Sequence, residues 1–72
     1  MKIKFDSEAD AAYIYLADEI RAGGVARTYL CDPVEVRGMI NLDFVANGRL
    51  IGIEIMDASR MLTEDVLDEA KC

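Results

Sequence analysis

The residues best suited to chemistry are two acids and an amide in the most regularly alternating part of the sequence. Apolar and polar residues alternate there, so Asn41, Asp43 and Glu54 are expected on one face of a predicted sheet. Two neighbouring carboxyl groups can divide into acid and base when burial separates their pKa values. Nothing in the sequence would bury this pair. We therefore expect no catalytic residues and regard the three side chains as candidate ligand-binding residues.

A second acidic group has the spacing of the first ligands in a calcium loop. Asp6, Glu8 and Asp10 alternate, but alanine occupies the two later positions at which such a loop needs glycine and a bidentate glutamate. We predict a solvent-exposed hairpin loop with an Asx-type turn instead. Cys31 and Cys72 cannot form a closed zinc site without histidine, and both are expected to be reduced. The sequence therefore predicts neither a metal nor a cofactor.

The composition excludes several classes of function. The chain has no histidine, so neither a Ser-His-Asp nor a Cys-His nucleophile can form. Its 14 acidic and 8 basic residues give a net charge of -6, which does not suit the neutralisation of phosphates. We expect no nucleic acid and no membrane as partners. The longest apolar run, residues 11–17, is too short to span a bilayer, and the first residues lack an apolar signal region, which indicates a cytoplasmic protein.

Most of the chain has the pattern of strands. Residues 2–5 and 12–16 alternate or carry aromatic and β-branched side chains, and the acidic turn between them predicts a hairpin. Residues 25–30 predict a third strand. Asp32-Pro33 must interrupt regular pairing because proline lacks an amide donor. Residues 34–38 could then begin another strand or cross as a loop.

The clearest local prediction is a hairpin within residues 39–56. Asn47-Gly48 is the preferred centre of a two-residue type I′ turn, and apolar residues alternate with polar ones on both sides of it. Such a turn places apolar residues opposite one another, in the pairs Phe44–Ile51, Leu42–Ile53 and Ile40–Ile55. A shift of one residue would separate these pairs, so the turn and the alternation predict the same register.

After Asp57 the apolar period changes from that of a strand to that of a helix. Leu62, Val66 and Ala70 recur at a spacing of four, and Thr63 can cap the first turn. We predict one C-terminal amphipathic helix that covers the apolar face of the hairpin, formed by Ile40, Leu42, Phe44, Ile51, Ile53 and Ile55. The fold class is therefore α+β. A single domain, residues 1–72, would contain a small antiparallel meander of four to five strands with the helix packed on one face.

The face opposite the helix would expose several apolar side chains. These are Tyr13, Tyr15, Met39, Val45, Leu50 and Met56. Large apolar patches on small proteins mark interfaces, and tyrosine and methionine are enriched there. We therefore expect a homo-oligomer, most simply a symmetric dimer. The alternative is that residues 18–24 or 31–38 fold over these side chains.

Residues 1–16 and 48–59 resemble a family of short bacterial proteins described as domain of unknown function 2283. The motifs that carry the resemblance are Glu8-Ala9-Asp10-Ala11, the tyrosine-containing strand after it, Ile51-Gly52-Ile53-Glu54-Ile55 and Asp57-Ala58-Ser59. Residues 17–38 resemble the family weakly, and Tyr15 stands where the family often has a basic residue. The resemblance implies a small antiparallel sheet with a helix, and it implies no catalytic residues.

Two classes of function remain. One is an interaction module, either a homo-oligomer or an acidic partner of a basic protein, as an antitoxin-like neutraliser of a toxic nuclease would be. A net charge of -6 would steer such a partner. The other is a small-molecule-binding protein or minor enzyme whose site forms between subunits, using Glu54, Asp43, Tyr13 or Tyr15. We favour the interaction module over the enzyme.

Overall fold

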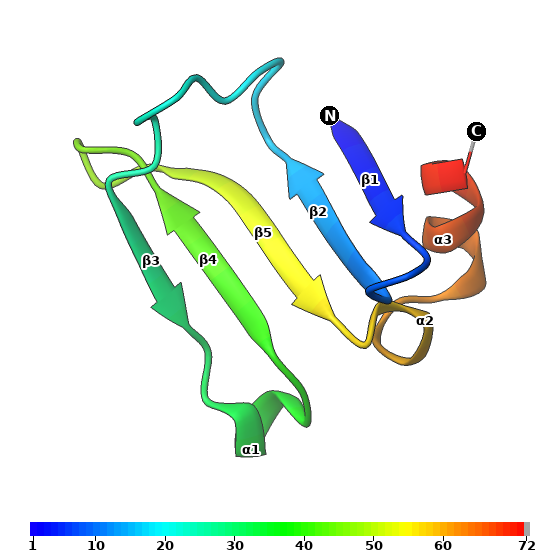
Figure 1. Ribbon diagram of the computed structural model, residues 1–72. Helices are drawn as coiled ribbons and strands as arrows, with labels where there is room; N and C mark the ends of the chain where they lie inside the picture. The colour runs from blue at the N-terminus through cyan, green and yellow to red at the C-terminus, as the bar shows by residue number, and fades with distance from the viewer. Residues whose placement is uncertain (72) are drawn as a thin grey trace.

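Five antiparallel strands form one sheet in the spatial order β1-β2-β5-β4-β3 (Figure 1). The computed structural model describes residues 1–71, so Cys72 lies outside the described residues, while Cys31 is a free, half-buried thiol. The strands are β1 (Lys2–Asp6), β2 (Ala11–Tyr15), β3 (Arg27–Leu30), β4 (Ile40–Phe44) and β5 (Leu50–Met56). The helices are α1 (Pro33–Val36), α2 (Ala58–Met61) and α3 (Glu64–Lys71). The α+β class and the antiparallel sheet are confirmed.

The strand order departs from the predicted meander. β5 lies between β2 and β4, and residues 16–26 carry the chain from β2 to the far edge, where β3 pairs with β4. β5 suits the central position because both neighbours offer it apolar partners. Ile53 lies opposite Ile14 of β2 and opposite Leu42 of β4. A meander would make β5 an edge strand with only one of these partners, and that part of the prediction was wrong.

The β4–β5 hairpin keeps the predicted register in its middle and loses it near its turn. The confirmed pairs are Leu42–Ile53 and Ile40–Ile55. Phe44, however, lies opposite Leu50 and not opposite Ile51. A β-bulge explains the difference, because it leaves Ile51 as an extra residue between paired positions.

The turn of this hairpin also differs from the predicted type I′ turn. The Val45 carbonyl accepts a hydrogen bond from the Gly48 N–H at 2.9 Å, and the Val45 N–H donates to the Arg49 carbonyl at 2.9 Å, which closes a three-residue loop. Gly48 has a φ of 88°, the left-handed conformation found at the third position of such loops. The extra loop residue shifts the pairing by one, and the bulge at Ile51 shifts it back. The type I′ prediction was wrong, and the predicted register survives because the two departures cancel.

The chain after β3 forms neither the strand nor the loop that the sequence left open. Residues Pro33–Val36 form the one-turn helix α1. Asp32 Oδ1 accepts a hydrogen bond from the Val34 N–H at 2.9 Å, and Pro33 occupies the first turn, where its missing N–H costs nothing. The same proline that ends β3 therefore starts a helix.

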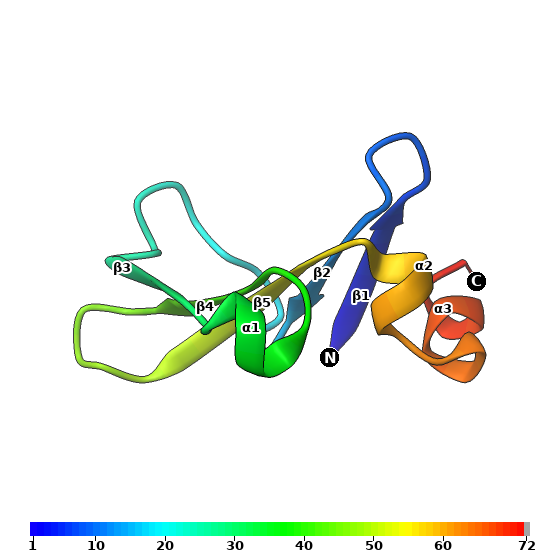
Figure 2. The same cartoon turned by 90° about the horizontal axis from the view of Figure 1, so that it is seen from below.

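The two C-terminal helices cover only the β1 end of the apolar face. α3 packs against β1, and α2 packs against β2 and β5. The buried cluster between helices and sheet consists of Ala12, Ala58 and Leu67, with Phe5 and Leu62 packed against it. In Figure 2, α2 and α3 both lie beside β1, and neither extends over β3 or β4. Within residues 1–71, no helix is long and apolar enough to cross a membrane.

The prediction that the helix covers the apolar face of the β4–β5 hairpin was therefore wrong. α3 does begin where expected, and Thr63 Oγ1 accepts a hydrogen bond from the Val66 N–H at 3.4 Å. Its position follows from the end of β5, where Asp57 takes a left-handed φ of 52° and the chain turns back toward β2 and β1. A hydrophobic stripe indicates which side of a helix is buried, but it does not indicate which strands that side meets.

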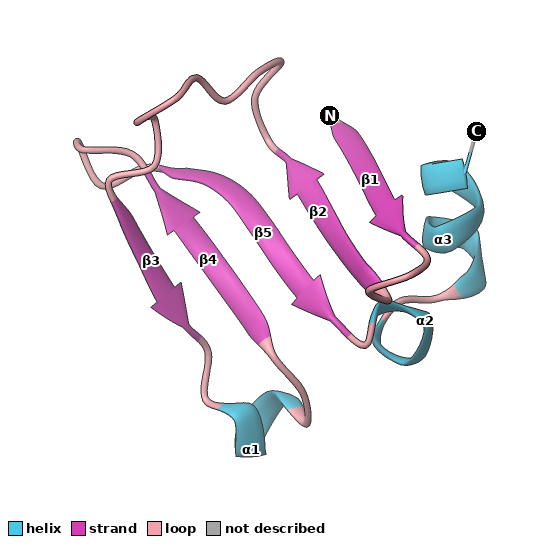
Figure 3. Ribbon diagram, viewed as in Figure 1, coloured by secondary structure: helices cyan, strands magenta, loops and turns pink. Residues whose placement is uncertain are grey.

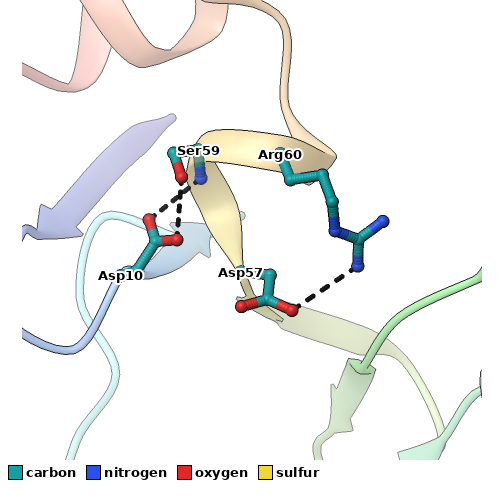
Figure 4. A network of polar contacts seen from close by, with 4 residues as sticks. All are labelled: Asp10, Asp57, Ser59 and Arg60. Carbon is teal, nitrogen blue, oxygen red and sulfur yellow. Dashed lines mark hydrogen bonds and ion pairs between the residues drawn. The ribbon is translucent and has the colours of Figure 1, made fainter.

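The β1–β2 turn holds the start of α2 in place. Asp10 Oδ1 accepts a hydrogen bond from the Ser59 N–H at 3.0 Å, and Asp10 Oδ2 accepts one from Ser59 Oγ at 2.8 Å (Figure 4). The Asp10 carbonyl accepts a further bond from the Ala58 N–H at 2.9 Å. Asp57, the residue next to α2, makes no side-chain capping bond and instead pairs with Arg60, with 3.5 Å between Oδ2 and Nη2. Asp10 therefore caps the helix from a distant part of the chain, and we call this contact the Asp10–Ser59 latch.

The predicted Asx-type turn is present in the rest of the acidic loop. Asp6 Oδ1 accepts a hydrogen bond from the Glu8 N–H at 3.0 Å, which is the predicted Asx-type turn. In residues 1–71, no group of three or more histidine, cysteine or acidic side chains is arranged to hold a metal ion. The alternating acids thus serve two purposes, since Asp6 shapes the turn and Asp10 caps a helix.

Replacing Asp10 by alanine should lower the free energy of unfolding by about 2 kcal/mol. The variant loses both bonds of the latch and places alanine at a left-handed φ of 50°, which alanine disfavours. Urea denaturation monitored by circular dichroism measures the change. Asp10→Asn is the matched control, because asparagine keeps one acceptor oxygen and tolerates this conformation, so it should lose less than half as much. An alanine variant as stable as the native protein would contradict the latch.

Candidate functional site

Polar side chains gather on the sheet face opposite the buried cluster, which we call the polar face. The strand register aligns one row of residues across the sheet, Lys4, Tyr13, Glu54, Asn41 and, at the β3 edge, the apolar Leu30. It aligns a second row beside the first, Lys2, Tyr15, Gly52, Asp43 and Thr28. Paired residues of antiparallel strands share a face. The three candidate ligand-binding residues therefore lie together on one face, as the alternation predicts.

Asp43 is the centre of the polar face. Its Oδ2 accepts a hydrogen bond from Tyr13 Oη at 2.6 Å, and its Oδ1 accepts one from Thr28 Oγ1 at 2.6 Å. Tyr13 comes from β2, two strands away, whereas Thr28 comes from the neighbouring strand β3. Both oxygens of one carboxylate are thereby held by hydroxyl groups from opposite sides.

Gly52 makes the long reach of Tyr13 possible. It lies on β5 between Tyr15 of β2 and Asp43 of β4, and the Tyr13 ring passes over it. A Cβ atom on Gly52 would lie 2.5 Å from Tyr13 Cζ and closer still to the hydroxyl oxygen. Only glycine leaves this space open, which explains a glycine in the middle of a central strand.

Glu54 and Asn41 form a second polar contact in the adjoining row. Asn41 Nδ2 donates a hydrogen bond to Glu54 Oε1 at 2.8 Å. Among the described side chains, those of residues 1–70, neither Glu54 nor Asp43 forms an ion pair. The two carboxylates of the polar face are thus stabilised by neutral hydrogen-bond donors.

The environment of Tyr13 keeps its phenol protonated. Burial, above all, raises the pKa of Tyr13 well above its ordinary value of 10.0, and the hydrogen bond to Asp43 and the negative charge of that carboxylate add to the effect. Tyr13 is therefore a hydrogen-bond donor at neutral pH, not a base or a nucleophile. The Tyr13–Asp43–Thr28 group links β2, β4 and β3 through one carboxylate.

A shallow cavity of about 460 Å³ lies beside this group. Its lining includes Lys4, Asp6, Ala11, Tyr13, Tyr15 and Glu54. The rings of Tyr13 and Tyr15 meet edge to face with centroids 4.8 Å apart, and Lys2 Nζ lies 5.0 Å from the centroid of the Tyr15 ring. Aromatic rings and charges of both signs border the cavity, which is open to solvent.

The six residues predicted to form an interface do not make one patch. Tyr13, Tyr15 and Met56 lie half-buried on the polar face. Met39 is exposed just before β4, and Val45 belongs to the hairpin loop. Leu50 lies opposite Phe44 and so belongs to the other face of the sheet, because of the bulge at Ile51.

Sequence reasoning missed the roles of Tyr13 and Thr28 as partners of Asp43. The sequence places Tyr13 on an exposed apolar face and Thr28 in a strand, and neither placement indicates a bond to Asp43. The available signal was Gly52, since a glycine inside a central strand indicates close approach by another group. The sequence does not indicate which group approaches Gly52, because the neighbours of β5 depend on the strand order.

The fold and the polar face define a small α+β protein with one five-stranded antiparallel sheet. The family model described as protein of unknown function (DUF2283) matches residues 2–59, so the chain belongs to this family. The matched range contains all five strands and both residues of the Asp10–Ser59 latch, and it ends before α3. Searches of the curated proteins and of the solved structures each found no match.

The motifs that carried the family resemblance now have structural reasons. Asp10 of the acidic turn and Ser59 at the end of the matched range are the two sides of the latch. Gly52 admits the Tyr13 ring, and Glu54 accepts the hydrogen bond of Asn41. All of these contacts stabilise the pairing of β2, β4 and β5 or the docking of α2.

Replacing Gly52 by alanine should lower the free energy of unfolding by about 1 to 3 kcal/mol, because the new methyl group collides with the Tyr13 ring. Urea denaturation of Gly52→Ala in two backgrounds tests the cause. In the Tyr13→Ala background the ring is absent, so the same substitution should cost much less. An equal cost in both backgrounds would contradict the proposed collision.

Tyr13 should ionise at a higher pH than a free phenol, whose pKa is 10.0. The folded state holds this proton more tightly than the unfolded state, so the resulting stability is fully present below pH 10.0 and falls as the pH rises through the raised pKa. Phenolate absorbance, followed together with urea denaturation at alkaline pH, measures both effects. Tyr13→Phe should remove the last-ionising part of the absorbance change. The opposite result, an unchanged titration curve in that variant, would contradict the assignment.

Proposed function

We propose that this protein is a homodimer-forming interaction module whose interface is the uncovered apolar face of the sheet. This face, which we call the open apolar face, is formed by Ile14, Tyr29, Leu42, Phe44, Leu50 and Ile53. The observation that carries the proposal is that β4, although it is an inner strand, has no buried residue. β4 has a strand on each side, yet none of its residues is buried.

The neighbouring strand supports the same conclusion. All four residues of β3 are exposed, and 53% of Tyr29 is accessible to solvent. Among the described residues, the buried hydrophobic side chains are Ala12, Ile55, Ala58 and Leu67, all at the end covered by the helices or beside it. A sheet with one face this apolar normally packs that face against a second layer.

The accessible surface of the molecule exceeds that expected for a compact protein of its mass. The molecule has a solvent-accessible surface of 5204 Å². A compact protein of 8.0 kDa is expected to have about 4,450 Å². The excess, roughly 750 Å², is close to the ~800 Å² that each partner buries in an interface of standard size.

The charge distribution favours a second copy over a basic protein as the partner. The chain carries a net charge of -6, but the strand positions of the open apolar face carry no acidic residue. Arg27 is the charged residue on this side of β3, and its guanidinium lies over the Phe44 ring, 4.4 Å from the centroid. Two copies can therefore join these faces without bringing carboxylates together, as aligned sheets do in a sandwich.

Leu42 lies in the middle of the open apolar face, so Leu42→Lys should prevent association through this face by placing a charge in the interface. Light scattering after size exclusion should give the native protein at least twice the mass of 8.0 kDa and should give the variant a lower mass. Leu50→Lys is a second variant on the same face, and because 39% of Leu50 is exposed, a charge there leaves the monomer folded.

Val34→Lys is the matched control, since Val34 lies on α1, beyond the ends of β3 and β4 (Figure 1), and is 82% exposed. It adds the same charge and should leave the mass of the native protein unchanged. A native protein of 8.0 kDa at high concentration would overturn the proposal. Native mass in both Leu42→Lys and Leu50→Lys would show that the copies associate through another surface.

A further inference from the structure

We infer that β3 is a second self-association site, at which the β3 strands of two copies pair antiparallel about a two-fold axis through Tyr29. The paired strands would join two sheets into one continuous sheet. This contact uses the edge of the sheet and is separate from the open apolar face. It needs no feature of the proposed face-to-face dimer.

The two edges of the sheet differ in how they are protected. α3 packs against β1 and lies beside that edge of the sheet (Figure 1). β3 forms the opposite edge, and no helix or strand of the described residues 1–71 lies along its outer side (Figure 3). Natural proteins protect such edges with proline, charged side chains, bulges or very short strands. β3 has four residues and one charge, Arg27 at its first position, and Thr28–Leu30 contain no charge, proline or bulge. β3 thus presents unpaired backbone groups in a regular strand.

The register shows which backbone groups face outward. The Cys31 N–H donates to the Ile40 carbonyl at 2.9 Å, so Cys31 is a hydrogen-bonded position of the β3–β4 ladder. Hydrogen-bonded positions alternate in antiparallel pairs. Tyr29 therefore bonds to β4, whereas the N–H and C=O groups of Thr28 and Leu30 point away from the sheet.

These outward groups are self-complementary. With Tyr29 opposite Tyr29 of a second copy, Thr28 lies opposite Leu30 of that copy, and each such pair can exchange both backbone hydrogen bonds. The two Tyr29 side chains then face each other at a close, non-hydrogen-bonded pair, where cross-strand aromatic contacts are favourable. The strand is already held in place, because Thr28 Oγ1 donates to Asp43.

The register also brings no like charges together at the ends of the strand. Arg27 would lie opposite Cys31 of the second copy, which is uncharged as a thiol. A second copy therefore matches the β3 edge in hydrogen bonding and side-chain pairing.

The edge contact leaves the open apolar faces of both copies on the same side of the joined sheet, because antiparallel neighbours in one sheet share their faces. Each joined sheet can then stack on another through that side. Four copies related by two-fold axes would use both contacts. This arrangement is a common symmetry for tetramers.

Amide hydrogen exchange of the native protein tests the edge directly. If β3 is unpaired, the amides of Thr28 and Leu30 face solvent and should exchange rapidly. If β3 pairs with a second copy, the same two amides should be protected at least 100-fold relative to the unpaired strand. The expected result is protection at high protein concentration that is lost on dilution. Rapid exchange of both amides at every concentration overturns the inference, whatever the mass of the protein.

Leu30→Pro supplies the matching variant, because it removes an outward N–H that β3 does not use in pairing with β4. A native tetramer has a mass of four times 8.0 kDa, and Leu30→Pro should halve this mass. Leu30→Val keeps the N–H and should leave the mass unchanged. A Leu30→Pro protein with native mass and a protected Thr28 amide overturns the inference. Protection of Thr28 and Leu30 that persists in Leu42→Lys supports the edge contact independently of the face-to-face dimer. Protection that appears only after an extended peptide of another protein is added also overturns self-pairing.

Discussion

The pairing of β2 with β5 is the interaction on which the rest of the structure depends. It joins residues 11–15 to residues 52–56 and connects the N-terminal hairpin to the three strands that follow. On one face it brings Ala12 against Ile55, both almost completely buried. On the other it sets Tyr13 over Gly52 so that the hydroxyl reaches Asp43. Just beyond its end, Asp10 caps α2, so the same pairing also determines where the helices dock.

Local patterns predicted the strands well because alternation records which side of each strand is buried. The pairs Leu42–Ile53 and Ile40–Ile55 followed from the alternation, and Asn41, Asp43 and Glu54 fell on one face for the same reason. The turn was less readable. Asn47-Gly48 fits two kinds of turn, and only the position of Gly48 in the loop distinguishes them. The error had no effect on the middle of the hairpin, since the bulge at Ile51 compensates for the longer loop.

Long-range features could not be read from the residues in the same way. The position of β5 between β2 and β4 depends on which edges pair, and two apolar strands offer no sign of their neighbour. The link from Tyr13 to Asp43 crosses that strand, so it was hidden with the strand order. The helix position depends on the turn at Asp57 and on Asp10, and an amphipathic pattern in residues 62–70 describes neither. These features are also the ones that leave one face of the sheet uncovered.

The central position of β5 also constrains the order in which a newly made chain can fold. Strands β1 and β2 are complete by residue 15, but their partner strand ends at residue 56. An isolated two-stranded hairpin is at best marginally stable in water. During synthesis from the N-terminus, β2 therefore remains an unprotected edge while the next forty or so residues are added. The sheet can close only when most of the chain has left the ribosome, and α2, held by Asp10, follows within a few residues.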